Sequence, residues 1–156
     1  MMLKSLVMSL AAISALAVHG QEIATCRGPA GRAFFHFEGL TDKAGSGWTE
    51  DKISKGVFSI SRTGANEYDI LYIDIQNKPI STKQEGGIVR LIRRGKTNLT
   101  FLVFYPMVTT EIYSLFTEKD GRSPFSLMQN KTGEGAVFPK SSVMVGDCDP
   151  IRFDVQ

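Results

Sequence analysis

The stretch NLTFLVFYPMVTTEIYSLF, residues 98–116, decides the fold because it contains two candidate strands separated by a proline. It is rich in the β-branched and aromatic residues that suit strands, and Glu111 is its only charged residue. Pro106 has no backbone N–H to donate to a β-ladder, so we place it at a strand end or tight corner. The stretch therefore predicts two strands that meet at Pro106.

The first of these strands is apolar on both faces toward its middle. Alternation along residues 98–105 gives one face with Leu99, Phe101, Val103 and Tyr105, and another with Asn98, Thr100, Leu102 and Phe104. A sheet with one solvated face alternates more cleanly than this. We expect residues 40–55 or 130–140 to fold across the second face; a ligand-holding interior and an exposed docking surface are the alternatives.

Similar period-two patterns recur along the rest of the chain. They occur at residues 32–38, 56–61, 67–76, 87–94, 97–105, 107–116, 124–130 and 141–147, and glycine, asparagine, aspartate or proline turns separate most of them. This spacing predicts about eight short strands, joined in order as an all-β antiparallel meander. A small barrel is our first choice of architecture and a two-layer sandwich the second.

Residues 49–54 are the one helix candidate. Thr49 can cap a helix, Glu50 and Asp51 suit the positive end of its first turn, and Gly56 would stop it. We therefore expect at most one short helix in the fold.

The first twenty residues differ from the rest of the chain. Lys4 supplies a positive start, and SLVMSLAAISALAV is an apolar run typical of a signal peptide. The run is short for a membrane anchor, which needs roughly 20 apolar residues. We expect cleavage after Gly20, with a cut after Ala17 as the alternative, and a single domain formed by residues 21–156. A retained anchor helix is the opposing interpretation.

Cys26 and Cys148 are the only cysteines, one near each end of the mature chain. An exported chain meets an oxidising compartment, so the two predict one structural disulfide. A redox or metal pair is disfavoured because there is no C-x-x-C spacing and no nearby histidine. We therefore expect a periplasmic or secreted protein whose two ends are joined.

The charge balance gives no argument for a nucleic-acid partner. Of the 18 basic residues in the whole chain, cleavage removes Lys4, which leaves 17 against 16 acidic residues. A net charge this close to zero does not favour DNA, RNA or an anionic membrane as a partner. After cleavage, we expect no stable membrane anchor.

Candidate catalytic groups are sparse, and we expect no enzyme, no cofactor and no bound metal. His36 is the single histidine of the mature chain, which makes a Ser-His-Asp triad or a multi-histidine zinc site hard to assemble. Asp69 and Asp74 are five residues apart and so face opposite sides of one strand. Glu111 is expected to be an outward, solvated charge.

Two other features have a structural and a functional interpretation. Trp48, the only tryptophan, is the one candidate binding residue, although packing as a lid on the barrel end is the favoured interpretation. A basic cluster at Arg90, Arg93, Arg94 and Lys96 is expected to be a solvated hairpin end that protects a sheet edge. Contact with an anionic partner is its alternative.

Four segments carry a resemblance to known proteins: CRGPAG (26–31), GWTEDKI (47–53), EIY (111–113) and KSSVMVGDC (140–148). With these segments the chain resembles a group of small exported proteins of unknown function from alphaproteobacteria. The resemblance covers most of the mature chain and implies export and the disulfide. It implies no activity and no functional residue.

These observations leave three functional hypotheses. The leading one is an exported, non-catalytic β-protein that binds a small apolar ligand. The second is a module that binds an envelope protein, such as an inhibitor of a cell-envelope enzyme, which rests on analogy of fold. The third is a hydrolase with an unrecognised site, which predicts a cleft holding a carboxylate of perturbed pKa.

Overall fold

The structure is a computed structural model that describes residues 20–53, 55–73 and 76–154. Ten strands occur there: β1 (Gln21–Phe35), β2 (Gly47–Lys52), β3 (Val57–Gly64), β4 (Glu67–Ile73), β5 (Pro79–Ser81), β6 (Ile88–Arg94), β7 (Asn98–Tyr105), β8 (Thr109–Phe116), β9 (Pro124–Lys131) and β10 (Lys140–Cys148). The expected signal peptide, apart from Gly20, lies outside the described residues, as does Asp74. No membrane-spanning helix is found in the part of the chain that the structure describes.

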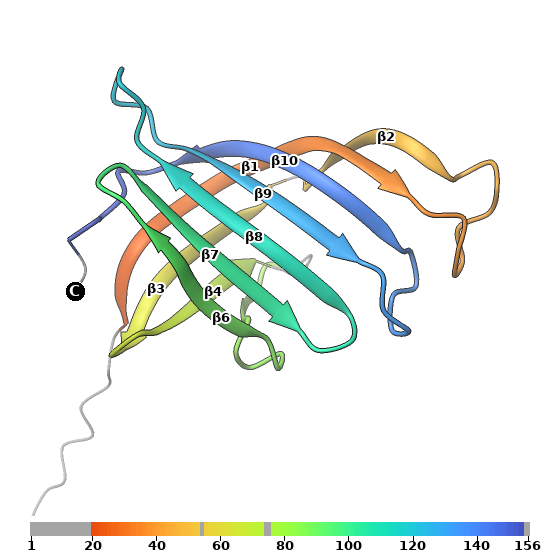
Figure 1. Cartoon of the computed structure of the whole chain (residues 1–156), viewed down its shortest axis with the longest axis horizontal. Helices are drawn as coiled ribbons and strands as arrows, with labels where there is room; N and C mark the ends of the chain where they lie inside the picture. Colours follow the sequence, from red (N-terminus) through yellow and green to blue (C-terminus); the bar gives the residue numbers. More distant parts are fainter. Residues whose placement is uncertain (1–19, 54, 74–75, 155–156) are drawn as a thin grey trace, which may run out of the picture.

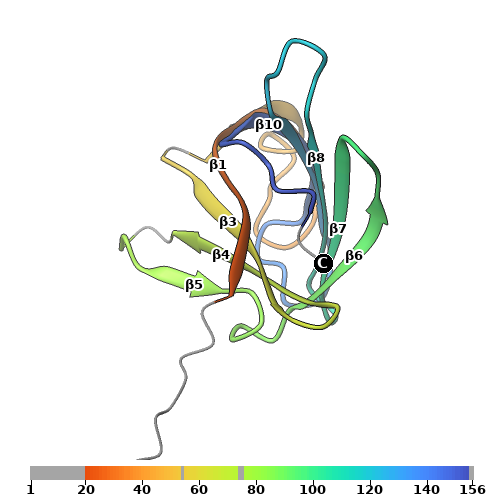
Figure 2. The ribbon, with the colours of Figure 1, turned by 90° about the vertical axis from the view of Figure 1, so that its left-hand side faces the viewer.

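All ten strands belong to one antiparallel sheet that curls into a half-barrel (Figures 1 and 2). The strand order is β5-β4-β3-β1-β10-β9-β8-β7-β6, and β2 pairs with β1 outside this path. No backbone ladder joins β5 to β6 across the described residues, and β4 and β6 meet on that side only through side chains, such as the hydrogen bond from Arg94 to the Tyr68 hydroxyl. The predicted all-β antiparallel meander is confirmed, with two short strands, β2 and β5, added to the expected set.

The first and last strands along the chain meet in the middle of this sheet. β1 and β10 run antiparallel side by side, and Cys26 lies directly opposite Cys148 in their register. The two cysteines form the predicted disulfide, with their Cα atoms 3.9 Å apart. The bridge therefore ties the half that contains β3–β5 to the half that contains β6–β9.

The helix expected at residues 49–54 is wrong, because most of this segment is β2. Ser54 lies outside the described residues, and β2 pairs with β1 from Ala30 opposite Lys52 to Phe35 opposite Gly47. β1 continues beyond the end of β3, so its backbone groups need another partner there, and β2 supplies them. This long-range pairing outweighs the local preference of Thr49 to cap a helix.

β1 can change partner along its length because it bends in the middle. A register shift lies between Arg27 and Ala30, and Gly28 has a φ of +66°, which a residue with a side chain rarely adopts. Before the bend, β1 pairs with β3; after it, with β2. The bulge therefore helps to set the curvature of the half-barrel.

The concave face of the sheet holds the hydrophobic core. Leu99, Phe101 and Val103 of β7 point into it, as the alternation predicted, and Phe101 is fully buried. The convex face is not covered: Phe104 is 43 % exposed, Met128 49 % and Val145 58 %. The expectation that a segment folds across the second face is therefore wrong for the described residues.

Candidate ligand-binding cavity

A cavity of about 680 Å³ occupies the end of the concave face beside the β7–β8 turn. Apolar and aromatic residues form much of its wall: Val57 and Phe58 of β3, Tyr72 and Ile73 of β4, Tyr105 of β7, Val108 of the β7–β8 turn, Tyr113 of β8 and Leu127 of β9. Polar residues from the ends of three neighbouring strands, and Glu85 of the β5–β6 loop, also line it. The cavity is thus bounded by both halves of the curled sheet.

The concave face changes from apolar to polar along β8, β9 and β10, in rows set by the strand register. Successive rows are Tyr113–Leu127–Met144, Glu111–Gln129–Ser142 and Thr109–Lys131–Lys140. The first row belongs to the core. The next two contribute Glu111, Gln129, Thr109 and both lysines to the cavity wall. The core therefore gives way to a cavity where the inward side chains become polar.

Glu111 is the most unusual group in this wall, because it is a carboxylate with only 9 % of its surface exposed. Its Oε2 accepts a hydrogen bond of 2.8 Å from the Tyr113 hydroxyl, and its Oε1 accepts one of 2.7 Å from Nε2 of Gln129. No lysine or arginine of the described residues forms an ion pair with it. A carboxylate offers about four acceptor positions, so Glu111 retains capacity for a further donor.

Two tyrosines near Glu111 have perturbed acidities. Burial raises the pKa of Tyr105 to about 12, and the nearby charge of Glu111 adds to the effect. Burial, followed by the charge of Glu111, holds the pKa of Tyr113 well above its usual value. Tyr72 also lines the cavity, so the three tyrosines and the Glu111 carboxylate form one cluster of polar groups in its wall.

The two lysines of the outer polar row differ in their partners. Nζ of Lys140 lies 2.5 Å from Oδ2 of Asp51 and 5.6 Å from the ring centre of Phe35. Lys131 lies opposite Lys140 on β9 and forms no ion pair with a described residue. The charge of Lys140 is thus largely matched by Asp51, and Lys131 is the remaining cation of the wall.

The expectation that Glu111 points outward is wrong. Thr109, Glu111, Tyr113 and Leu115 share the concave face of β8, and Leu115 is fully buried there. The alternation therefore places Glu111 on the same side as the core. The sequence signal that could have indicated this is the placement of Glu111 two residues before Tyr113 and four before Leu115.

Trp48, the predicted candidate binding residue, lies outside the cavity. It is on β2 and 63 % exposed, and its ring makes an edge contact with Phe34 at 5.6 Å. The favoured interpretation of a lid on the barrel end is not confirmed. Trp48 instead lines a small hollow on the convex face with Ile112, Met128 and Val143.

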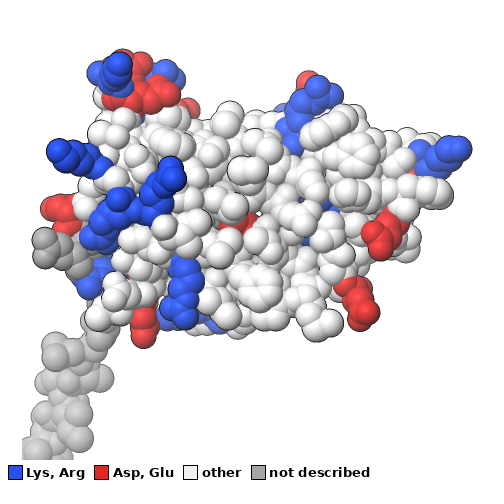
Figure 3. Space-filling model, viewed as in Figure 1, with Lys and Arg blue, Asp and Glu red and all other residues white. Residues whose placement is uncertain are grey.

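The convex face carries little charge over its central strands. Figure 3 shows that the basic and acidic side chains gather mainly toward the two ends of this view, and the area over β7, β8 and β9 is largely uncharged. Arg90, Arg93 and Lys96 are exposed on or beside β6, which is an edge of the sheet. The interpretation of this cluster as a solvated, edge-protecting hairpin end fits that placement.

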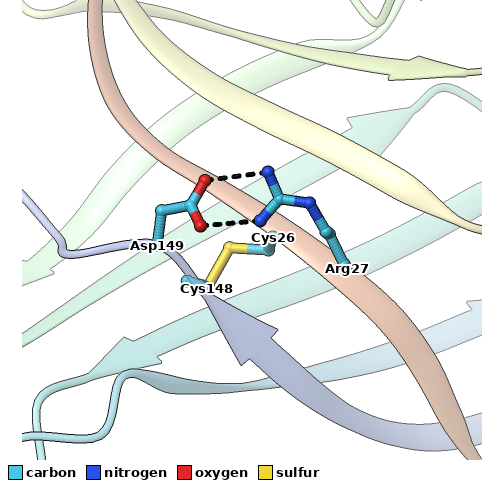
Figure 4. Close-up of a disulfide and its surroundings, with 4 residues drawn as sticks. All are labelled: Cys26, Arg27, Cys148 and Asp149. Carbon is cyan, nitrogen blue, oxygen red and sulfur yellow. Dashed lines mark hydrogen bonds and ion pairs between the residues drawn. A yellow bond between two sulfur atoms is a disulfide. The ribbon is translucent and has the colours of Figure 1, made fainter.

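The disulfide lies beside an exposed ion pair rather than in the cavity wall. Figure 4 shows the guanidinium of Arg27 against the carboxylate of Asp149, joined by hydrogen bonds of 2.7 and 2.9 Å. These hydrogen bonds from Arg27 lower the pKa of the Asp149 carboxyl. The surroundings of Cys26 and Cys148 are therefore those of a structural bridge at the junction of β1 and β10.

His36 also has a structural environment. It follows the end of β1, its Nε2 lies 3.3 Å from the Ser141 hydroxyl, and its ring meets that of Phe34 edge-on at 5.2 Å. No group of three or more histidine, cysteine or carboxylate side chains suited to a metal ion occurs in residues 20–53, 55–73 and 76–154.

Comparisons with protein families, with curated proteins and with solved structures gave no match.

Proposed function

We propose that this protein is an exported, non-catalytic β-protein that binds a small, predominantly apolar molecule in the cavity of its half-barrel. The observation that carries the proposal is the cavity of about 680 Å³ beside the core. Small-molecule sites commonly have volumes of about 300–1,000 Å³, with apolar walls and a few converging polar groups. Apolar walls at Phe58 of β3 and Leu127 of β9, with polar groups at Glu111 and Gln129, match that description.

Export to the periplasm or the cell exterior is part of the proposal. The apolar run in the first twenty residues supports it, as does the Cys26–Cys148 bridge, because disulfides persist mainly in oxidising compartments. The bridge also supports the binding role, since it fixes the junction between the two halves of the sheet that form the cavity wall. A preformed cavity loses less conformational entropy when a ligand binds, which favours a higher affinity.

Native mass spectrometry tests this proposal on protein exported with its own N-terminal segment into a bacterial periplasm and purified gently. We expect an additional mass that is released on denaturation. Thr109→Trp, which places a large ring at the cavity wall on the concave face of β8, should remove that mass. Val145→Trp is the matched control on the convex face, where the native valine is 58 % exposed, and should retain it.

Two results would contradict the proposal. One is a bare mature chain from the wild-type preparation, which would exclude tight binding of any molecule available in that compartment. The other is an additional mass that persists in the Thr109→Trp variant, since the molecule would then be bound elsewhere. Circular dichroism of each variant establishes that the fold is retained.

A second candidate function is a protein-binding module, and the convex face favours it. Trp48, Met128 and Val143 expose apolar surface around one hollow, and exposed aromatic residues are common at binding surfaces. A photo-crosslinking residue at position 48, introduced in the exported protein, tests this function. A single specific adduct with an envelope protein would support it, whereas the absence of adducts would count against it.

A further inference from the structure

We propose that the cavity selects a primary alkylammonium ion, that is, a protonated amine attached to an apolar chain. This inference rests on the proposed ligand-binding function and names the chemical class of the ligand. Its basis is the combination of a buried, unpaired carboxylate with aromatic side chains in one cavity wall.

The carboxylate of Glu111 provides the recognition group. A buried charge is unfavourable unless it is paired and hydrogen-bonded, and Glu111 has two hydrogen bonds but no cationic partner in the described residues. An ammonium group in the cavity would supply the missing positive charge. Its N–H groups would donate to the acceptor positions that Tyr113 and Gln129 leave vacant.

Aromatic side chains add a second attraction for a cation. Phe58, Tyr72, Tyr105 and Tyr113 all line the cavity, and Tyr72 and Tyr105 belong to the same polar cluster as Glu111. The faces of such rings attract ammonium groups, most strongly where water is excluded. The apolar chain of the ligand would lie against Phe58 and Leu127.

The lysines of the wall do not reverse this preference. Lys140 is paired with Asp51, and Lys131 belongs to the next row along β9, one row further from the core than Glu111. A ligand carboxylate could reach only Lys131 as an unpaired cation. An anionic ligand would also bring its charge close to Glu111, and like charges repel.

Isothermal titration calorimetry with three probes of equal chain length tests the inference: octylammonium, octan-1-ol and octanoate at neutral pH. We expect wild-type protein to bind octylammonium more tightly than the other two. Glu111→Gln keeps the size of the side chain and removes its charge, and should weaken octylammonium binding by about 30-fold or more. Octan-1-ol binding should change by no more than about twofold, because an uncharged ligand forms no ion pair with the Glu111 carboxylate.

Glu50→Gln is the matched control, since it makes the same chemical change at an exposed position of β2 and should behave as wild type. If Glu111→Gln fails to fold, Tyr105→Leu provides a second test: it should weaken octylammonium binding by about fivefold and leave octan-1-ol binding unchanged.

The outcomes separate this inference from the proposed function. Equal affinities for octylammonium and octan-1-ol, or tighter binding of octanoate, would overturn the ammonium inference and leave the ligand-binding function intact. A charge preference that survives in Glu111→Gln would also overturn it. Absence of binding for all three probes would count against both proposals.

Discussion

Removing the Cys26–Cys148 disulfide should lower the free energy of unfolding by about 5 kcal/mol. The perturbation is the double variant Cys26→Ala with Cys148→Ala, which deletes the bond without placing a new polar group in the core. Cys26 is fully buried and belongs to the hydrophobic cluster. Because β1 and β10 are also held by their backbone ladder, the variant should still adopt the native fold.

The magnitude follows from the length of chain that the bridge closes. The two cysteines are separated by 122 residues. In the chain-entropy model, a loop of this size reduces the entropy of the unfolded chain by about 16 cal/mol/K, which corresponds to about 5 kcal/mol at room temperature. Most of the effect therefore arises in the unfolded state, where the bridge restricts the long segment between the two cysteines.

Urea denaturation followed by far-UV circular dichroism provides the measurement. The double variant should have a lower midpoint, and its m-value should be larger because an uncrosslinked unfolded chain exposes more surface. Asp149→Asn is a useful control: it removes the exposed ion pair with Arg27 beside the bridge and should leave the midpoint nearly unchanged. A double variant within about 1 kcal/mol of wild type would refute the entropic reasoning.

The other predictions concern the two faces of β7 and the buried tyrosines. Phe101→Ala should cost about 3–5 kcal/mol because the ring is fully buried, whereas Phe104→Ala on the convex face should cost about 1 kcal/mol or less, as measured by urea denaturation. Equal costs would contradict the assignment of the faces. Tyr105, with a pKa of about 12, and Tyr113, whose pKa is also raised, should stay protonated in the folded state above the pH at which tyrosines of the unfolded chain ionise. The free energy of unfolding should therefore fall as the pH rises from about 10 toward 12; tyrosinate absorbance that develops at the unfolded-chain pH in native protein, and that is lost in Tyr105→Phe or Tyr113→Phe, would contradict this.

Much of the fold could be predicted because it depends on local features of the chain. The alternation of Leu99, Phe101 and Val103 predicted a strand and its two faces, and Pro106 predicted where that strand ends. The disulfide was also predictable, since two cysteines allow only one intramolecular pairing. These inferences needed no knowledge of which strands become neighbours beyond their order in the chain.

The candidate site could not be predicted in the same way. Glu111 was expected in solvent because an isolated charge in an apolar strand is usually exposed. Its partners, Tyr113 on its own strand and Gln129 on β9, come together only when β8 and β9 pair in one particular register. A shift of one residue would exchange the concave and convex faces of the strand.

The sequence by itself determined the strand period, the main turns and the bridge, because each depends on a few residues close in sequence or on cysteine chemistry. The tertiary structure decided that residues 49–52 pair as a strand with β1, that the convex face stays open, and that Glu111 faces a cavity. The physical reason is that periodicity distinguishes two faces of a strand but does not say which face the curled sheet encloses. That choice is made by pairings between residues far apart in the chain.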